Sequence, residues 1–427
     1  MDATLDYIAD FSAFLHASPS SYHAAAEVAR RLHAAGFTRL DEPEKWTIDE
    51  AVGFYVVRDG AVIAWSQPAG AGPTTPFRIL GAHTDSPGFK LKPKPTISSH
   101  GWLQAGVEVY GGPLQNSWLD RELELAGRLV TRQGTEHLVR TGPFLRIPQL
   151  AVHLDREVNN GLTLDRQRHL TPVFGVGEAS EADLVAHLAG LAGLRAADVA
   201  GYDILTADTN PPATFGLGDT LFAAGRLDNL SSVYAGLHAL IATSHLTTGG
   251  SINVLAAFDH EELGSQSRSG ASGPFLDDIL TRIGYGLGAT GSERLQAYAE
   301  SWCLSADAGH AVHPNYPERH DPANQPILGG GPLLKINANQ RYATDAHGAA
   351  LWARTCARAN VEYQEFVSNN TVPCGSTIGP LTATRLGIRV VDVGVPLLSM
   401  HSAREMCHVN DPQSLAAATA AFFAPEV

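Results

Sequence analysis

Hydrophobic residues near the start of the chain recur every three or four positions, which is the spacing of an amphipathic helix. One such run covers residues 4–16, and a second covers 22–35. The intervening Ser18-Pro19-Ser20-Ser21 breaks the first run and supplies capping hydroxyls for the second. Gly36 follows, where a glycine commonly ends a helix. This part of the chain therefore predicts two helices.

Short runs that are apolar at most positions predict buried strands, because a strand with one face in solvent would alternate polar and apolar residues. The runs 54–57 and 61–65 are joined by Arg58-Asp59-Gly60, which is typical of a β-hairpin. The run 77–80 leads through Gly81-Ala82 to His83 and Asp85, and the run 252–258 leads directly into Asp259 and the residues after it. We expect both to be strands inside an α/β fold, with their carboxyl ends at a ligand crevice.

The character of the sequence changes after residue 91. Lys92-Pro93-Lys94-Pro95 indicates a proline-broken linker, and the stretch that follows is rich in glycine, proline and short β-prone runs. We therefore expect an inserted, mostly β domain at 92–225. It would separate two parts of one α/β domain, at 1–91 and 226–427.

Two features of the expected insert bear on its role. Its clearest helical pattern spans 180–193, and Ser180 is placed to cap that helix. The apolar segment 150–155 carries a single histidine, His153. From the residues by themselves, His153 is better interpreted as structural than as functional.

The α/β pattern resumes in the last part of the chain. Helical spacing of apolar residues covers 229–243, an alanine-rich stretch near 349–359, and 412–423. A further apolar run at 388–393 predicts a strand.

Composition narrows the function classes. The chain has 427 residues, a formal net charge of −14 and 44% hydrophobic residues, so it can bury a large core. Its acidity argues against a nucleic-acid partner. The four cysteines form no close pairs, the N-terminus lacks a positively charged leader, and no apolar run has transmembrane length. We expect a soluble, cytoplasmic protein with reduced thiols and no membrane partner.

Glu261 and Glu262 come just after the apolar run that ends at Phe258, with Asp259 and His260 in between. Neighbouring side chains on an extended or turning backbone point in different directions, so one carboxylate can bind a metal while the other accepts a proton from water. The alternative is a helix start, where acidic residues are favoured by the helix dipole. A glycosidase acid pair fits poorly, because adjacent residues rarely present carboxyls across one bond.

His83 and Asp85 follow another predicted strand. A metal-binding histidine needs its other ring nitrogen bonded, and a nearby carboxylate such as Asp85 can do this. The alternative is a hydrogen-bonded loop histidine. Asp228 stands before the helical run 229–243, where it could cap the helix or bridge two metals.

Two more sites follow the same pattern of ionisable residues after apolar runs, at Asp307 and at His401. Two histidines and three carboxylates are a suitable ligand supply for two divalent ions. Nitrogen and oxygen ligands without thiolate favour zinc, cobalt or manganese. Glu261 is then left over as the general base.

Six motifs together resemble the M18 family of metallopeptidases, the aspartyl aminopeptidases. They are Gly81–Pro87, Arg226–Asn229, Phe258–Ser265, Ser305–Tyr316, Lys335–Tyr342 and Met400–Glu405. They occur in order across essentially the whole chain. The resemblance implies an α/β, mixed-sheet dinuclear zinc exopeptidase domain interrupted by a mostly β dimerisation domain. It also implies a homo-oligomer, a tetrahedral dodecamer built from dimers.

The resemblance also implies roles for individual residues. The metal ligands would be His83, Asp228, Glu262, Asp307 and His401. His83 and Asp307 would share one zinc and Glu262 and His401 the other, with Asp228 bridging, although the residues themselves leave this pairing open. Cobalt or manganese could substitute. The substrate-binding residues would be His153, acting in a neighbouring subunit, together with His310, Lys335 and Tyr342.

The expected activity is hydrolysis of an N-terminal residue, preferentially Asp or Glu, from peptides through a metal-activated bridging water. Glu261 would be the general base, and Lys335 and His153 suit an acidic side chain. Two alternatives remain open at this point. One is a related exopeptidase or deacylase with another pocket, and the other is an oligomeric cage or acidic-peptide binder that has lost catalysis.

Overall fold

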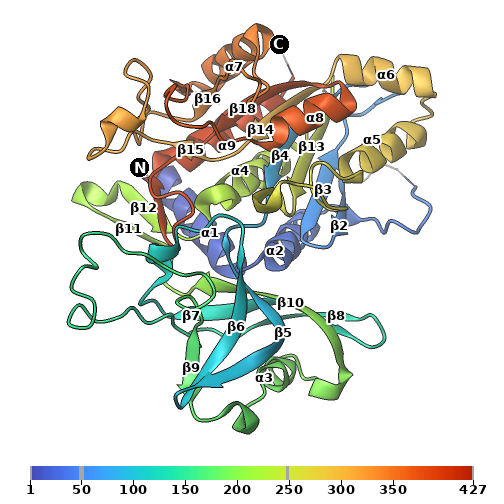
Figure 1. Cartoon of the computed structure of the whole chain (residues 1–427). Helices are drawn as coiled ribbons and strands as arrows, with labels where there is room; N and C mark the ends of the chain where they lie inside the picture. Colours follow the sequence, from blue (N-terminus) through green and yellow to red (C-terminus); the bar gives the residue numbers. More distant parts are fainter. Residues whose placement is uncertain (1, 48–51, 247–249, 426–427) are drawn as a thin grey trace.

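The computed structural model describes residues 2–47, 52–246 and 250–425, and within these ranges the chain is a mixed α/β protein with several sheets (Figure 1). A nine-stranded mixed sheet, called the large sheet below, has the order β1-β2-β3-β13-β4-β14-β18-β16-β17 in this part of the chain. Its strands are β1 (Thr38–Arg39), β2 (Phe54–Arg58), β3 (Ala61–Ser66), β4 (Phe77–His83), β13 (Ile252–Phe258), β14 (Trp302–Ala306), β16 (Leu333–Lys335), β17 (Gln364–Phe366) and β18 (Arg389–Gly394).

The centre of the large sheet is formed by β13, β4 and β14, which run parallel to one another. Phe258, the last residue of β13, pairs with His83, the last residue of β4. Every residue of β13 is buried. The predicted hairpin is confirmed, because β2 and β3 pair antiparallel, and β3 in turn pairs with β13.

Helices cover both faces of the large sheet, which explains why its central strands are mostly apolar. One core contains Leu255 of β13 together with helices α1 (Asp2–Ala17), α2 (Ser21–Ala34), α4 (Leu227–Thr243), α7 (Ala346–Ala359) and α9 (Asn410–Phe423). The other contains Val254, on the opposite face, with α5 (Phe275–Gly286), α6 (Gly291–Ala299) and α8 (Ile378–Leu386). Each fully buried aliphatic side chain contributes roughly 1.5–3 kcal/mol.

A second sheet, called the antiparallel sheet below, forms the lower part of the molecule in Figure 1. Among the described residues its order is β8-β7-β10-β5-β6-β9, and all its pairings are antiparallel. Its elements are β5 (Gly88–Ser99), β6 (Trp102–Tyr110), β7 (Leu123–Thr131), β8 (Glu136–Arg140), β9 (Val173–Val176), β10 (Val199–Asp208) and the packed helix α3 (Leu184–Leu191).

Smaller pairings join the tail of the chain to the rest. β11 (Ala213–Phe215) and β12 (Leu221–Ala224) form a small sheet with β20 (Glu405–His408), and β15 (Gly309–His310) pairs with β19 (Pro396–Leu397). The division into domains at residues 92 and 225 stays a prediction.

The linker predicted at residues 92–95 is wrong. Lys92, Pro93, Lys94 and Pro95 lie within β5. Prolines are tolerated there because the pairing between β5 and β6 is interrupted from Leu91 to Thr96, and β10 pairs with β5 only at Lys90. A proline has no N–H to lose at such an irregularity.

The predicted helix at 180–193 is confirmed in type, but its start is wrong. Ser180 lies in a short 3₁₀ turn, Ala179–Glu181. Helix α3 begins later because the carboxylate of Asp183 accepts a hydrogen bond from the N–H of Ala186 at 3.0 Å and caps it. The other predicted helices match α1, α2, α4, α7 and α9 to within a few residues.

The cysteines and the helices add two observations. All four cysteines are free thiols. No helix in the described ranges combines the length and the apolar character that crossing a membrane requires.

Candidate metal centre and active site

The predicted site residues meet at the carboxyl ends of the central strands of the large sheet. His83 ends β4, Asp307 directly follows β14, and Glu261 and Glu262 lie in a 3₁₀ turn, Glu261–Leu263, just after β13. Parallel strands bring their carboxyl ends to one edge of a sheet, so these residues converge although they are far apart in sequence. His401 joins them from the loop after β19.

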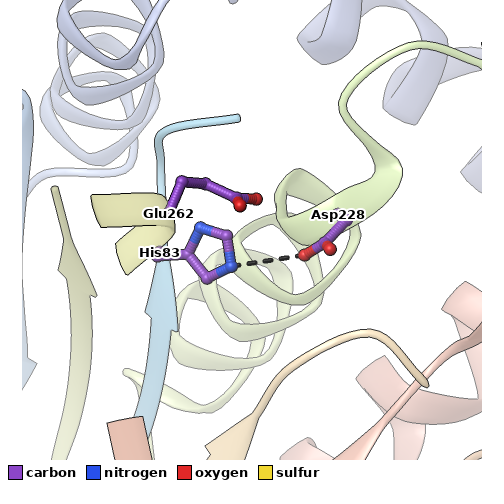
Figure 2. A group of neighbouring side chains, drawn as sticks. All are labelled: His83, Asp228 and Glu262. Atoms are coloured by element: carbon purple, nitrogen blue, oxygen red, sulfur yellow. Dashed lines mark ion pairs between the residues drawn. The ribbon is translucent and has the colours of Figure 1, made fainter. Parts of the chain in front are cut away.

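Asp228 lies between the two histidines. Its Oδ1 is 3.2 Å from His83 Nε2, and its Oδ2 is 3.4 Å from His401 Nε2. His83 Nε2 is also 3.5 Å from Asp307 Oδ1, and His401 Nε2 is 3.4 Å from Glu262 Oε2. Figure 2 shows His83, Asp228 and Glu262 turned toward one another. The Asp228 carboxylate therefore divides the five predicted ligands into two groups.

Asp228 is not the cap of helix α4. The capping position is Arg226, and Asp228 itself has a non-helical backbone with φ −82° and ψ 103°. Its side chain is almost completely buried, and its Oδ1 accepts no hydrogen bond in the described structure. The metal-facing alternative for Asp228 is the one that this backbone favours.

Asp85 supports both His83 and the two glutamates. The His83 ring bonds through Nδ1 to the backbone carbonyl of Asp85 at 3.0 Å, and the Asp85 carboxylate lies 3.4 Å from the same nitrogen. That carboxylate also accepts the N–H groups of Glu261 at 3.0 Å and Glu262 at 3.2 Å, and the Tyr110 hydroxyl at 2.9 Å. A bonded Nδ1 leaves Nε2 of His83 directed at the site.

Glu405 holds the opposite side of the site. Its carboxylate accepts the N–H of Asp228 at 3.0 Å and the N–H of His401 at 2.8 Å. Glu405 is buried, so the two hydrogen bonds replace its contact with water. It fixes the backbone of two site residues that are 173 positions apart in the printed sequence.

The crowding of carboxylates shifts the pKa values in the site. Burial, and then the charges of Asp307, Asp228 and Asp85, raise the pKa of Glu261 to about 7. Burial and the Asp228 charge raise the pKa of Glu262. The imidazoles of His401 and His83, which face its two oxygens, hold the pKa of Asp228 well below its usual range despite its burial. Four buried or half-buried carboxylates this close together call for positive charge.

The donor set fits zinc. Two buried carboxylate oxygens, Asp228 Oδ1 and Glu262 Oε1, accept no hydrogen bond within the described structure. Together with His83, these residues present ligand atoms within 4.8 Å of one another. Imidazole nitrogens and carboxylate oxygens are ligands that zinc accepts, and a cation would satisfy oxygens that are otherwise costly to bury.

A cavity of about 260 Å³ opens in front of these ligands. It is also lined by His310, Lys335 and Tyr342, three of the four predicted substrate-binding residues. Lys335 is buried; its ammonium donates to the carbonyl of Ala308 at 2.7 Å and lies 5.4 Å from the centre of the Tyr342 ring. No carboxylate in the described part of the chain forms an ion pair with Lys335. Its charge is therefore available to a ligand.

His153 is the predicted residue that the structure does not bring to the site. It lies in an exposed turn at residues 152–154, and the cavity wall described above does not include it. Its neighbours Leu150, Val152 and Leu154 are exposed hydrophobic residues. Within one chain, His153 has no contact with the site.

Sequence reasoning missed three residues that shape the site, namely Glu405, Tyr110 and Asp392. Buried Asp392 accepts hydrogen bonds from the Ala343 N–H and the Thr377 hydroxyl, and so anchors both loops that carry Tyr342 and Ser376 past the cavity. Glu405 was within reach, because it ends the motif that contains His401. Nothing local marks Tyr110 or Asp392.

Comparison with known proteins gives one consistent family. The family model described as "Aminopeptidase I zinc metalloprotease (M18)" matches residues 14–423. The "Probable M18 family aminopeptidase 2" of Streptomyces avermitilis is 54% identical over 417 residues, covering 97% of this chain and 96% of that protein. The protein of the same description from Mycobacterium tuberculosis is 44% identical over 423 residues, covering 97% of each.

Solved structures agree in fold. A chain from the "Cryo-EM structure of the Ape4 and Nbr1 complex" superposes with a TM-score of 0.95 at 34% identity, over 99% of this chain and 86% of that one. A chain from the structure of the S. cerevisiae mApe1 dodecamer superposes with a TM-score of 0.87 at 27% identity, over 99% of this chain and 97% of that one. The chain therefore belongs to the M18 family of zinc aminopeptidases.

Proposed function

We propose that this M18 aminopeptidase removes N-terminal aspartate or glutamate from peptides with the help of two zinc ions. The observation that carries the proposal is the environment of Asp228, whose two oxygens face two separate groups of nitrogen and oxygen ligands. A carboxylate in that position suits a bridge between two cations. Cobalt or manganese could replace zinc at such ligands.

The distances between the side chains support one division of the ligands between the two ions. His83 and Asp307 would hold one zinc, and Glu262 and His401 the other, with Asp228 shared. Zinc bound there supplies Lewis acidity, which polarises a carbonyl and lowers the pKa of water. Asp85 and Glu405 act through the ligands, because they fix the orientation of His83 and the backbone of Asp228 and His401.

Glu261 is the proton carrier in this proposal. It is adjacent in sequence to Glu262 but its carboxylate approaches the other group, with Oε2 4.0 Å from His83 Nε2. Its raised pKa of about 7 suits both halves of the reaction. The Glu261 carboxylate accepts a proton from the attacking water and then donates that proton to the leaving amine.

The substrate residues supply charge and hydrogen bonds. Burial raises the pKa of Tyr342, so its phenol stays protonated and can donate to the oxygen that becomes negative during attack. His310, on the same cavity wall, is a second donor for this role. The buried ammonium of Lys335 is the natural partner of an acidic side chain on the first residue of the peptide.

We further propose that His153 completes the site of a neighbouring subunit in a tetrahedral dodecamer built from dimers. Its exposed position among exposed hydrophobic residues supports a role between subunits. The related S. cerevisiae protein is described as a dodecamer. The mass of the intact assembly and its activity should be measured for the wild type and for His153→Ala. A variant that keeps the wild-type mass but loses activity would place His153 in catalysis rather than in assembly.

Two measurements test the central proposal. The first is metal content by elemental analysis, with two zinc ions per chain expected. The second is kcat/KM on a panel of aminoacyl anilides, with Asp and Glu expected to exceed Ala, Leu and Lys. A single ion per chain would contradict the bridge. A preference for a neutral or basic first residue would contradict the role of Lys335 and favour a related exopeptidase specificity.

A further inference from the structure

A second cavity of about 240 Å³ adjoins the one in front of the metal ligands. The two cavities share His310, Tyr342 and Gly375 as parts of their walls. We call the second one the imidazole cavity, because His310, His313 and His320 all line it, together with Arg319. A peptide held at the metal ligands can therefore extend into the imidazole cavity across this common wall.

The two cavities differ in their acidic residues. The metal-side cavity is lined by Asp228, Glu261, Glu262 and Asp307. The wall of the imidazole cavity, as far as the described residues define it, contains no aspartate or glutamate. The nearest acidic partner of Arg319 is its neighbour Glu318, at 4.0 Å and with both side chains well exposed. Such a pair is weak, so Arg319 can turn to another anion.

The walls of the imidazole cavity are held by the fold. The Asn369 side chain donates to the carbonyls of Glu318 and His320, each at 3.1 Å. His320 also forms a β-bridge with Ser368, and its ring packs edge-on against Phe366. Arg319 and His320 therefore belong to a segment that is tied to the opposite wall.

His313 presents a hydrogen-bond donor. Its Nδ1 accepts the N–H of Asn315 at 3.1 Å, so the ring hydrogen is on Nε2. A neutral imidazole in this tautomer donates through Nε2 to an acceptor such as a carboxylate. The guanidinium of Arg319 adds further donors and a fixed charge.

Another cavity to which Asp228 contributes cannot take a peptide residue. It is lined by Ser20, Thr84 and Arg226 as well as by Asp228, and its volume is about 30 Å³. That is room for roughly one water molecule. The imidazole cavity is larger by a factor of eight and shares a wall with the metal-side cavity.

We propose that the imidazole cavity binds the residue that follows the scissile bond and favours a carboxylate there. The carboxylate can come from an acidic side chain or from the free C-terminus of a dipeptide. This inference rests on the proposed function, because it takes the metal ligands as the point where the peptide is cut. Arg319 and His313 are its specificity residues.

The experiment compares four substrates that all begin with aspartate: Asp-Ala-amide, Asp-Asp-amide, Asp-Lys-amide and the free dipeptide Asp-Ala. A hydrogen bond to a charged group contributes about 1.5–3 kcal/mol, so kcat/KM for a carboxylate-bearing substrate should exceed that for Asp-Ala-amide by about tenfold or more. Asp-Lys-amide should be the poorest. A gain for Asp-Asp-amide alone assigns the site to a side chain, and a gain for Asp-Ala alone assigns it to a C-terminus; either supports the proposal.

The variants Arg319→Gln and His313→Gln should each bring the ratio of carboxylate to neutral substrates toward one. Arg354→Gln, an exposed arginine on helix α7, is the matched control and should keep the wild-type ratio. Zinc content and circular dichroism identify a misfolded variant. If one of the two variants is misfolded, the substrate ratios of the other test the proposal. Equal kcat/KM for all four substrates, or ratios that neither variant changes, would overturn the proposal.

Repeating the series with leucine as the first residue separates this inference from the proposed function. If aspartate has no advantage over leucine in the first position, the acidic specificity at Lys335 fails. The preference at the second position is still read from the ratios within the leucine series. Each claim therefore has its own outcome.

Discussion

Glu405 accepts a hydrogen bond from the backbone N–H of Asp228 at 3.0 Å, and so holds the residue that faces both histidines. Its other oxygen bonds the N–H of His401. We predict that Glu405→Ala weakens zinc binding by about 10–100-fold, which is typical for the loss of a residue that orients metal ligands. Titration of the metal-free protein with zinc, against a chromogenic chelator, measures this directly.

Glu405→Gln is the informative companion variant. Its amide keeps one oxygen as an acceptor for one of the two N–H groups, so its loss of zinc affinity should be smaller than that of Glu405→Ala. Glu365→Gln, an exposed position on β17, should bind zinc like the wild type. Wild-type affinity in both Glu405 variants would show that the two hydrogen bonds are not needed to hold the ligands.

Glu261 and Glu262 are neighbours with different predicted roles. Glu261→Gln should lower kcat by about 10²–10⁴-fold, because it removes the proton acceptor, while zinc content stays at the wild-type value. Glu262→Gln should reduce zinc content as well as activity. Elemental analysis and initial rates on the same samples give both readouts. A Glu261→Gln enzyme with wild-type turnover would refute the assignment of the base.

Lys335 determines the expected preference for an acidic first residue. Lys335→Met keeps an unbranched chain beside Tyr342 but removes the charge, so kcat/KM for Asp substrates should fall by roughly tenfold to a hundredfold. The value for a Leu substrate should change much less. Lys45→Met, at an exposed position, is the control. An equal fall for Asp and Leu substrates would indicate a structural role for Lys335.

The sequence predicted the central strands well because their pattern is local. β13 and β4 are short apolar runs that end in ionisable residues, and burial on both faces requires that pattern. The convergence of His83 with Glu261 follows from the rule that parallel strands share a carboxyl edge. The pairing of Phe258 with His83 is a matter of register, which no run of residues specifies by itself.

Longer-range contacts were the part that the sequence could not supply. Glu405 meets Asp228 only after β20 has paired with β12, and Tyr110 meets Asp85 only after β6 has paired with β5. The prolines at 93 and 95 suggested a linker. Strand β5 tolerates them because its neighbours β6 and β10 do not pair with it there, and the local sequence does not reveal where that pairing stops. The apolar segment around His153 favoured a structural role for this histidine. In the structure His153 lies in an exposed turn, where it is not packed as a structural residue would be.

His23 should make the fold less stable in acid. Burial, and then the charges of Arg140 and Arg226, lower the pKa of His23 from 6.5 to about 4, and its Nδ1 lies 2.8 Å from the hydroxyl of Ser20, the cap of α2. Between pH 6.5 and pH 4 the unfolded chain binds a proton that the folded chain does not. The unfolding free energy therefore falls as the pH falls through this window, by at most about 1.4 kcal/mol per pH unit. Urea unfolding at pH 7.5 and pH 5 measures the change.

Two variants test whether His23 is the cause. His23→Asn should lose less unfolding free energy than the wild type, whereas His33→Asn, exposed on the same helix, should match the wild type. Identical losses in all three proteins would mean that other groups govern the acid sensitivity.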